Sequence, residues 1–298
     1  MDHGRTTASP GIFLLLLTLL PLTLAPAGCD RSGLGTSQVS RIKVISTVYP
    51  MADIAKQVGG PFVDVSWMIE GGQSFEGVQS TPELRGRLND AQLLITNGTE
   101  RWANQDAGDP FQRQRLIRLD LLNSTRQTPG IGRLWLDPVI AKDLARELCA
   151  RLLVARSEHE QYFRDRTNEF VADLDATVQQ YEVKFVAPRN RKVLVMGPEY
   201  NPLLYRFGLE PIQPVEASAT TLSDEAVTTL RDASKQNGTT LLLIPSDLPA
   251  VISRDIAFRT GLQVVPIDSL GSSADGGRTY ITMLRSNLDQ LLAATTFQ

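Results

Sequence analysis

Charged side chains occur in four short stretches, each of which follows a run of apolar residues that is typical of a strand. The stretches are the loop 71–82 with Glu76, the segment 132–138 with Arg133, the turn 197–200 with Gly197 and Glu199, and Asp268 followed by Ser269. Carboxylate oxygens are ligands that suit manganese, magnesium or calcium. A guanidinium would instead pair with the carboxylates and satisfy them without a metal. These residue types indicate a site that binds an ion or another small ligand.

The scarcity of histidine limits the chemistry that such a site can perform. The sequence contains His3, within the N-terminal targeting segment, and His159, in the first turn of a long predicted helix, where we expect it to be exposed. It has no glycine-rich phosphate loop, no Ser-His-Asp combination and no histidine free for acid–base catalysis, so we expect no enzyme. The net charge of −3 and the pI near 5.6 give no basic surface for a nucleic acid.

The N-terminus has the composition of an export signal. Arg5 precedes an apolar run over residues 12–24, and small residues then lead to Cys29. This pattern resembles a bacterial lipobox, although Pro26 stands where leucine is usual. We predict a signal peptide over residues 1–28, lipidation of Cys29 and a flexible tether over residues 29–40, which places the protein outside the cytoplasm on a membrane. A soluble secreted protein is the alternative.

Strand patterns alternate with helical patterns in two halves of the chain, which indicates parallel sheets with covered faces. The strand patterns cover residues 41–47, 63–69, 91–96, 192–196, 240–245 and 264–267. The runs RIKVIST and RKVLVM open the two halves, and AQLLITNG and TTLLLIPS follow at comparable places, which is a weak internal repeat. The predicted fold class is α/β, with two similar parallel-sheet lobes over residues 41–156 and 188–298.

A long helix is predicted between the two halves, over residues 157–187. Its capping box is Ser157 with Glu160, and Pro188 stops it. Six apolar residues recur at helical spacing along one stripe, namely Phe163, Phe170, Leu174, Val178, Tyr181 and Phe185. At 1.5 Å per residue such a helix is roughly 45 Å long, which is enough to bridge two lobes as their backbone. Ligands of open parallel sheets lie beyond the carboxyl ends of the strands, so the four charged stretches should line a cleft between the lobes.

The order of several motifs resembles that of the cluster A-I solute-binding proteins of zinc and manganese ABC importers. The motifs are KVISTVYPMADIAKQVGG, STPELRGRLNDAQLLITNG, LWLDP at residues 134–138, the long helix, YRFGLE at 205–210, and VVPIDSLG followed by YITMLRSNL. The resemblance covers essentially the whole mature chain. It implies two α/β lobes joined by one long helix, a divalent metal as the possible ligand, and an ABC permease in the cytoplasmic membrane as the partner of a monomeric, lipid-anchored protein.

The resemblance also implies four metal ligands, commonly two or three histidines together with carboxylates. Matched by their offsets from the motifs, the four positions fall on Glu76, Arg133, Gly197 and Asp268. A zinc site built on imidazole is therefore not available in this chain. Glu76 and Asp268 are the two positions that could still bind a metal.

Three interpretations of these positions remain open. In the first, Arg133 pairs with Glu76 and Asp268 and replaces the metal, because a divalent ion about 4 Å from a guanidinium meets roughly 8 kcal/mol of repulsion at an effective dielectric of 20. This is comparable to the free energy of micromolar binding, about 8 kcal/mol. In the second, Arg133 points outward and Glu76, Asp268 and Glu199 form an all-oxygen site. In the third, the carboxylates are solvated and Arg133 caps the end of a strand.

The resulting functional hypothesis is an extracytoplasmic solute-binding lipoprotein of a metal-ion ABC importer in which most metal ligands are replaced. The alternative is an envelope scaffold or sensor protein that keeps the two-lobe fold without a transport role. Neighbouring genes for a permease and an ATPase would favour the first hypothesis. The sequence leaves the identity of the ligand open.

Overall fold

The computed structural model of the 298-residue chain describes residues 40–69, 81–100, 116–124, 132–186, 191–214, 222–271 and 278–296. All of them belong to one compact unit that begins at Ser40. The predicted signal peptide, Cys29 and most of the tether lie outside the described residues. Within the described residues, no helix combines the length and the apolar character needed to cross a membrane.

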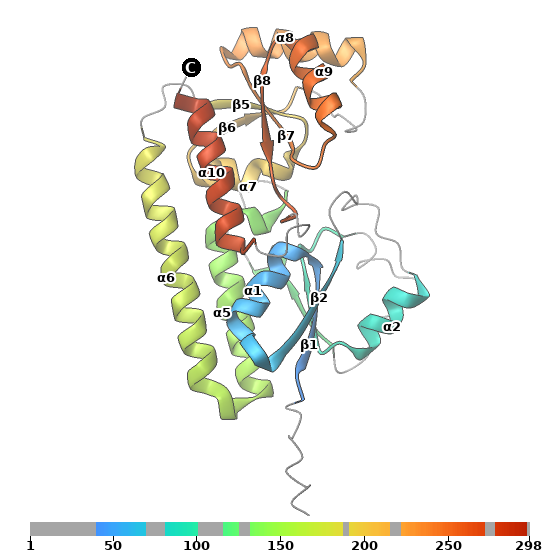
Figure 1. The fold of residues 1–298 in the computed structure, drawn as a ribbon, viewed down its shortest axis with the longest axis vertical. Coiled ribbons are helices and arrows are strands. Elements are labelled where there is room, and N and C mark those ends of the chain that lie inside the picture. Colours follow the sequence, from blue (N-terminus) through green and yellow to red (C-terminus); the bar gives the residue numbers. More distant parts are fainter. Residues whose placement is uncertain are drawn as a thin grey trace, which may run out of the picture. The chain divides into compact units, whose positions relative to one another are not determined.

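Two parallel sheets form the centres of the two lobes (Figure 1). The first has the order β2-β1-β3-β4 and contains β1 (Ile42–Val48), β2 (Val63–Ile69), β3 (Leu93–Thr96) and β4 (Ile117–Asp120). The second has the order β6-β5-β7-β8 and contains β5 (Lys192–Val195), β6 (Glu210–Ile212), β7 (Leu241–Pro245) and β8 (Gln263–Ile267). The strands from the repeated runs occupy equivalent positions in the two sheets: β1 and β5 are second in order, and β3 and β7 are third. The predicted fold class is confirmed.

Helices and short 3₁₀ turns connect the strands. The α-helices are α1 (Tyr49–Gly59), α2 (Pro82–Asp90), α4 (Leu121–Ser124), α5 (Pro138–Ala155), α6 (Glu160–Lys184), α7 (Asn201–Arg206), α8 (Asp224–Asn237), α9 (Ala250–Thr260) and α10 (Tyr280–Thr296). The 3₁₀ turns are η1 (Gly60–Phe62), η3 (Leu134–Leu136), η4 (Ser157–His159) and η5 (Pro198–Tyr200). α6 lies beside α5 and α10, and α1 packs against α5 and α6 (Figure 1).

The long helix is present but shorter than predicted. It begins at Glu160 rather than Ser157 and ends at Lys184, while Ala187 lies outside the described residues. The predicted capping box is wrong: His159 is the N-cap residue and no side chain caps the helix. The reason is the tight reversal from α5, which places Ser157 inside η4 instead of in the extended conformation that a capping residue needs.

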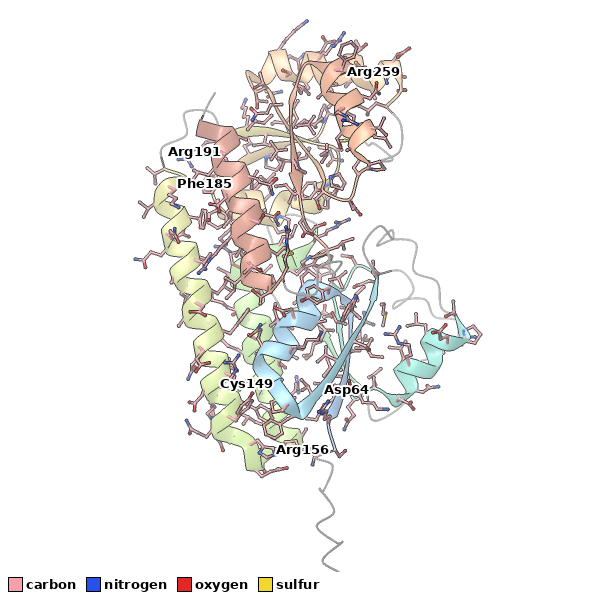
Figure 2. The ribbon with its side chains drawn as sticks, viewed as in Figure 1. Asp64, Cys149, Arg156, Phe185, Arg191 and Arg259 are labelled. Atoms are coloured by element: carbon pink, nitrogen blue, oxygen red, sulfur yellow. The ribbon has the colours of Figure 1, made fainter. Side chains whose placement is uncertain are left out.

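The apolar stripe of α6 is buried as predicted and reaches both lobes. The exposed fractions of the six predicted side chains are between 0 and 7%. Near one end of the helix the ring of Phe163 lies 5.7 Å from that of Phe62 in the first lobe. Near the other end, Phe185 lies 5.4 Å from Phe207 in the second lobe (Figure 2 labels Phe185). The helix therefore bridges the lobes by aromatic contacts at its two ends.

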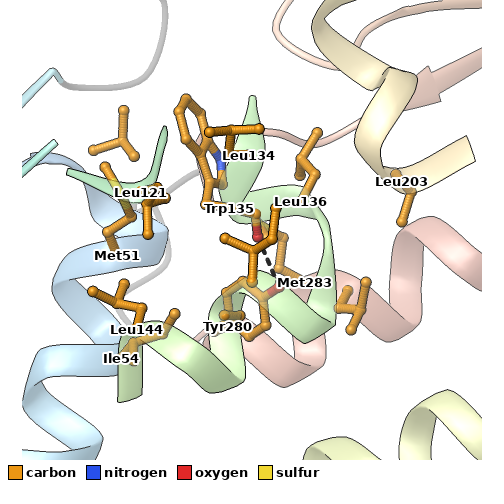
Figure 3. Close-up of a cluster of buried hydrophobic side chains, with 14 of the residues drawn as sticks. Met51, Ile54, Leu121, Leu134, Trp135, Leu136, Leu144, Leu203, Tyr280 and Met283 are labelled. Carbon is orange, nitrogen blue, oxygen red and sulfur yellow. Dashed lines mark hydrogen bonds between the residues drawn. The ribbon is translucent and has the colours of Figure 1, made fainter. Parts of the chain in front are cut away.

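The segment that enters α5 is buried where the two lobes meet. Leu134, Trp135 and Leu136 of η3 are fully buried among α1, α7 and α10 (Figure 3). The Trp135 indole Nε1–H donates to the carbonyl of Ser269 at 2.6 Å, and the Trp135 carbonyl accepts the hydroxyl of Tyr280 at 2.7 Å. Trp135 is thus a packing residue, and it connects the end of β8 to the start of α10.

Asp137 ends this segment with two roles. Its Oδ1 accepts the N–H of Val139 at 2.8 Å and so caps the N-terminus of α5. Its two oxygens also accept from the guanidinium of Arg206 on α7, at 2.8 and 2.7 Å. This bidentate pair stabilises a carboxylate that is 1% exposed and attaches α5 to the second lobe.

Asp53 of α1 makes a further connection, because its Oδ2 accepts the N–H of Tyr280 at 2.7 Å. Burial raises the pKa of Asp53, and this effect exceeds the lowering by that hydrogen bond, by Gln57 and by Lys56. The folded state therefore binds more protons than the unfolded state just above the ordinary carboxyl pKa, and stability falls as pH rises through this interval.

We predict that the Asp53→Asn variant lacks this component of the pH dependence. The difference in free energy of unfolding between wild type and variant should decline as the pH rises above about 3.9 and then level off. Urea unfolding at a series of pH values measures it. Asp64→Asn, at an exposed residue of β2 (Figure 2), controls for the loss of one carboxylate. A difference that stays constant or grows with pH would contradict the assignment.

Candidate functional site

Arg133 is held in place from both sides by the side chain of Asn97, which directly follows β3. The amide Nδ2 of Asn97 donates to the carbonyl of Gly132 at 2.9 Å, and its Oδ1 accepts the N–H of Leu134 at 2.9 Å. Both neighbours of Arg133 are therefore fixed to the carboxyl edge of the first sheet. The Asn97-Gly98 turn therefore positions the candidate site.

A buried carboxylate in turn holds the Asn97 turn. Glu100 is 2% exposed, and it accepts the N–H groups of Asn97 and Gly98, each at 2.7 Å. The hydroxyl of Thr47, near the end of β1, donates to the same carboxylate at 2.8 Å. Three donors satisfy this anion, which removes it from the carboxylates that could bind a ligand.

The guanidinium of Arg133 reaches the second lobe. Its Nη1 donates to the hydroxyl of Ser269, the residue after Asp268. The backbone N–H of Arg133 donates to the carbonyl of Glu199 at 3.0 Å. Arg133 is half-buried, and among the described residues it forms no ion pair. The structure therefore brings Arg133, Glu199 and Asp268 into one neighbourhood, as the sequence predicts.

Asp268 has partners of its own. Its Oδ1 accepts the N–H groups of Leu270 at 3.2 Å and Gly271 at 2.8 Å. Its Oδ2 lies 3.5 Å from Nη1 of Arg278, which ends the polar loop before α10. Asn287 on α10 fixes the Asp268 backbone with two hydrogen bonds, at 2.9 and 2.6 Å. The arginine that lies at the Asp268 carboxylate is therefore Arg278, whereas the sequence led us to expect Arg133.

Gly197 follows β5 and has no side chain to offer as a ligand. A Cβ atom at this position would lie 2.2 Å from Oε2 of Glu199. The Glu199 carboxylate therefore folds back over the place that a side chain of residue 197 would occupy. Glu199 is half-buried, and no ion pair to it occurs in the part of the chain that the structure describes.

Tyr200 lies beneath these charges, at the end of η5. It is fully buried, and burial raises the pKa of its phenol well above the usual range. The nearby charges of Glu199, Asp247 and Asp268 add to the increase in this pKa, and that of Arg133 opposes it. The phenol therefore stays protonated at neutral pH and can donate a hydrogen bond.

Of the predicted ligand residues, one cannot be placed. Glu76 lies outside the described residues, so its predicted pairing with Arg133 and its role as a metal ligand stay predictions. His159 lies in η4, half-buried, with its ring stacked 3.8 Å from that of Phe62. Within the described ranges, no group of three or more histidines, cysteines or carboxylates could hold a metal ion. The free Cys149 is buried in α5, as expected for a small apolar residue (Figure 2).

Sequence reasoning missed Arg278, Tyr200 and Asn201. Arg278 could have been found from the sequence. It directly precedes the helix that follows the last strand, so its side chain should lie near the end of that strand. Tyr200 carries none, because an aromatic residue in a helical pattern indicates packing whether or not its hydroxyl finds a partner.

Comparison with known proteins gives a consistent result over both lobes. Residues 44–294 match the family model of ZnuA, the periplasmic component A of the zinc-uptake complex. The chain is 19% identical to the high-affinity zinc uptake system protein ZnuA of Bacillus subtilis, over 94% of this chain and 96% of that protein. It is 20% identical to the manganese ABC transporter substrate-binding lipoprotein PsaA of Streptococcus mitis, again over 94 and 96%.

A solved structure shows the same fold. The chain aligns with the crystal structure of the Zn(II)-bound ZnuA-like domain of Streptococcus pneumoniae AdcA with a TM-score of 0.76 and 17% sequence identity. The alignment covers 86% of this chain and 100% of that domain. The two-lobe architecture is therefore shared by proteins that differ at most positions.

Proposed function

This chain belongs to the ZnuA family of periplasmic zinc-uptake components, and from that premise we propose that it is the solute-binding lipoprotein of an ABC importer. Members of this family are solute-binding proteins and not enzymes. The relatives are named as zinc and manganese binding components, several of them lipoproteins. We propose that Cys29 carries the lipid anchor, that the lobes act outside the cytoplasm, and that an ABC permease receives the solute.

We further propose that the metal ligands of the family are replaced in this chain. The supporting observation is the pair of guanidinium groups at the end of β8: Arg278 lies 3.5 Å from Asp268, and Arg133 donates to the adjacent Ser269. A divalent ion about 4 Å from one guanidinium would meet roughly 8 kcal/mol of repulsion at an effective dielectric of 20. Asp268 is already satisfied by a cation and two N–H groups, so a metal would also have to displace these.

Titration of the purified protein with zinc and manganese, by calorimetry and by native mass spectrometry, tests this part of the proposal. We expect no tight one-to-one complex with either ion. The Asp268→Asn variant is the control, because weak metal uptake elsewhere on the surface should not respond to it. Submicromolar, stoichiometric binding that Asp268→Asn abolishes would show that the metal site of the family persists.

A further inference from the structure

Two neighbouring residues near Arg133 carry buried polar atoms without a partner. They are the hydroxyl of Tyr200 and Oδ1 of Asn201, and among the described residues no other buried side-chain nitrogen or oxygen lacks a hydrogen bond. Tyr200 is 0% exposed, so bulk solvent does not reach its hydroxyl. Leaving a buried donor or acceptor unsatisfied is costly, and native proteins rarely do so without a functional reason. A ligand that bonds both atoms would remove the cost.

Two opposite charges lie next to these atoms without pairing with each other. The backbones of Arg133 and Glu199 are joined by a hydrogen bond of 3.0 Å, yet their side chains diverge. The guanidinium of Arg133 turns to Ser269, and the carboxylate of Glu199 folds back over Gly197. Glu199 and Arg133 are the charged groups that act most strongly on the Tyr200 hydroxyl. The site therefore offers one cation and one anion, not paired with each other, near a buried phenol.

We propose that this cleft binds a small zwitterion with one carboxylate and one ammonium group, such as a free amino acid. The ligand carboxylate accepts from the Arg133 guanidinium and the Tyr200 hydroxyl, and the ammonium group donates to the Glu199 carboxylate and the Asn201 amide oxygen. This proposal rests on the proposed function, because it names the class of solute that the importer would take. The hydroxyl lies below two half-buried residues, so binding requires the segments of Arg133 and Glu199 to move apart.

The arrangement of charges favours a zwitterion over ligands with one charge. A metal ion would be repelled by Arg133 and would leave the phenol without an acceptor. A simple anion would leave Glu199 and the Asn201 oxygen without donors. Asp268 does not enter this comparison, because Arg278 and two backbone N–H groups already satisfy it. A ligand with both charges is complementary to Arg133 and Glu199 and supplies partners for the two unpaired atoms of Tyr200 and Asn201.

Calorimetric titration of the purified protein with glycine, L-alanine, L-serine and β-alanine tests the proposal, with propionate and propylammonium as matched probes that carry one charge. We expect saturable one-to-one binding of at least one zwitterion, at least about tenfold tighter than either probe with one charge. Tyr200→Phe removes only the unpaired hydroxyl, so it should keep the fold and weaken binding about tenfold. Tyr205→Phe, at an exposed residue of the following helix α7, should change nothing.

Two results would overturn the inference. One is the absence of binding of all four zwitterions at millimolar concentration, and the other is zwitterion binding to Tyr200→Phe with unchanged affinity. Zinc titration of the same samples separates this failure from that of the proposed function. Tight zinc binding at Asp268 would contradict the replaced metal site, whereas the absence of both zinc and zwitterion binding would contradict the zwitterion alone.

Discussion

Replacement of Trp135 by alanine is expected to lower the free energy of unfolding by about 3–5 kcal/mol, the usual cost of removing a fully buried large aromatic side chain. The side chain is 0% exposed and lies between α1, α7 and α10 (Figure 3). Its removal leaves a cavity at the junction of the lobes and also removes the donor to the Ser269 carbonyl. In a chain of this size the melting temperature should fall by roughly 10 °C.

Two further variants separate the packing of Trp135 from its hydrogen bond. Trp135→Phe keeps an aromatic ring and loses the indole N–H, so we expect it to cost only about 1–2 kcal/mol. Trp67→Ala, at a half-buried tryptophan of β2, should cost less than Trp135→Ala. Thermal unfolding of the three variants measures the series. Equal losses for Trp135→Ala and Trp67→Ala would contradict the placement of Trp135 in the shared core.

Rebuilding the metal ligands should produce the largest gain of function. The triple variant Arg133→His, Gly197→His and Glu199→Ala places imidazoles at the two positions where the family resemblance expects them. Glu199→Ala is needed because a Cβ at residue 197 would lie 2.2 Å from the Glu199 carboxylate. The change removes one repelling cation and adds two ligands that suit zinc, so we expect zinc affinity to rise at least about 100-fold.

A matched triple variant controls for charge and shape. Arg133→Gln, Gly197→Ala and Glu199→Ala makes the same removals without supplying an imidazole, and should gain much less affinity. Competition against a zinc-sensitive dye measures both variants. If neither variant binds zinc more tightly than the wild type, the chain does not position residues 133 and 197 as the resemblance implies.

The strands that the sequence predicts best are those with continuous apolar runs. The central strands β1, β3, β5 and β7 lie within one or two residues of their predicted limits, because central parallel strands are apolar on both faces. β4 and β6 were not predicted. Both are edge strands, where one side needs no pairing, so β4 can alternate charged and apolar residues and β6 can contain Pro211.

The sequence predicted which segments form the site, but not which side chains pair with one another there. Parallel strands end at the same edge, so Asp268 and the turn at Gly197 were expected to meet Arg133. The pairing of Asp268 with Arg278 depends on the path of the loop before α10, which no local pattern specifies. The unpaired hydroxyl of Tyr200 results from the three-dimensional surroundings of one atom. Spacing and composition therefore indicated which segments meet, while the direction of each side chain required the structure.

Zinc-edge anomalous diffraction from crystals grown with excess zinc tests whether the metal ligands of the family are replaced. We expect no anomalous peak bonded to Asp268, with Arg278 still paired to its carboxylate and Arg133 still at Ser269. A peak about 2.0–2.2 Å from an Asp268 oxygen, with Arg133 turned away, would contradict it.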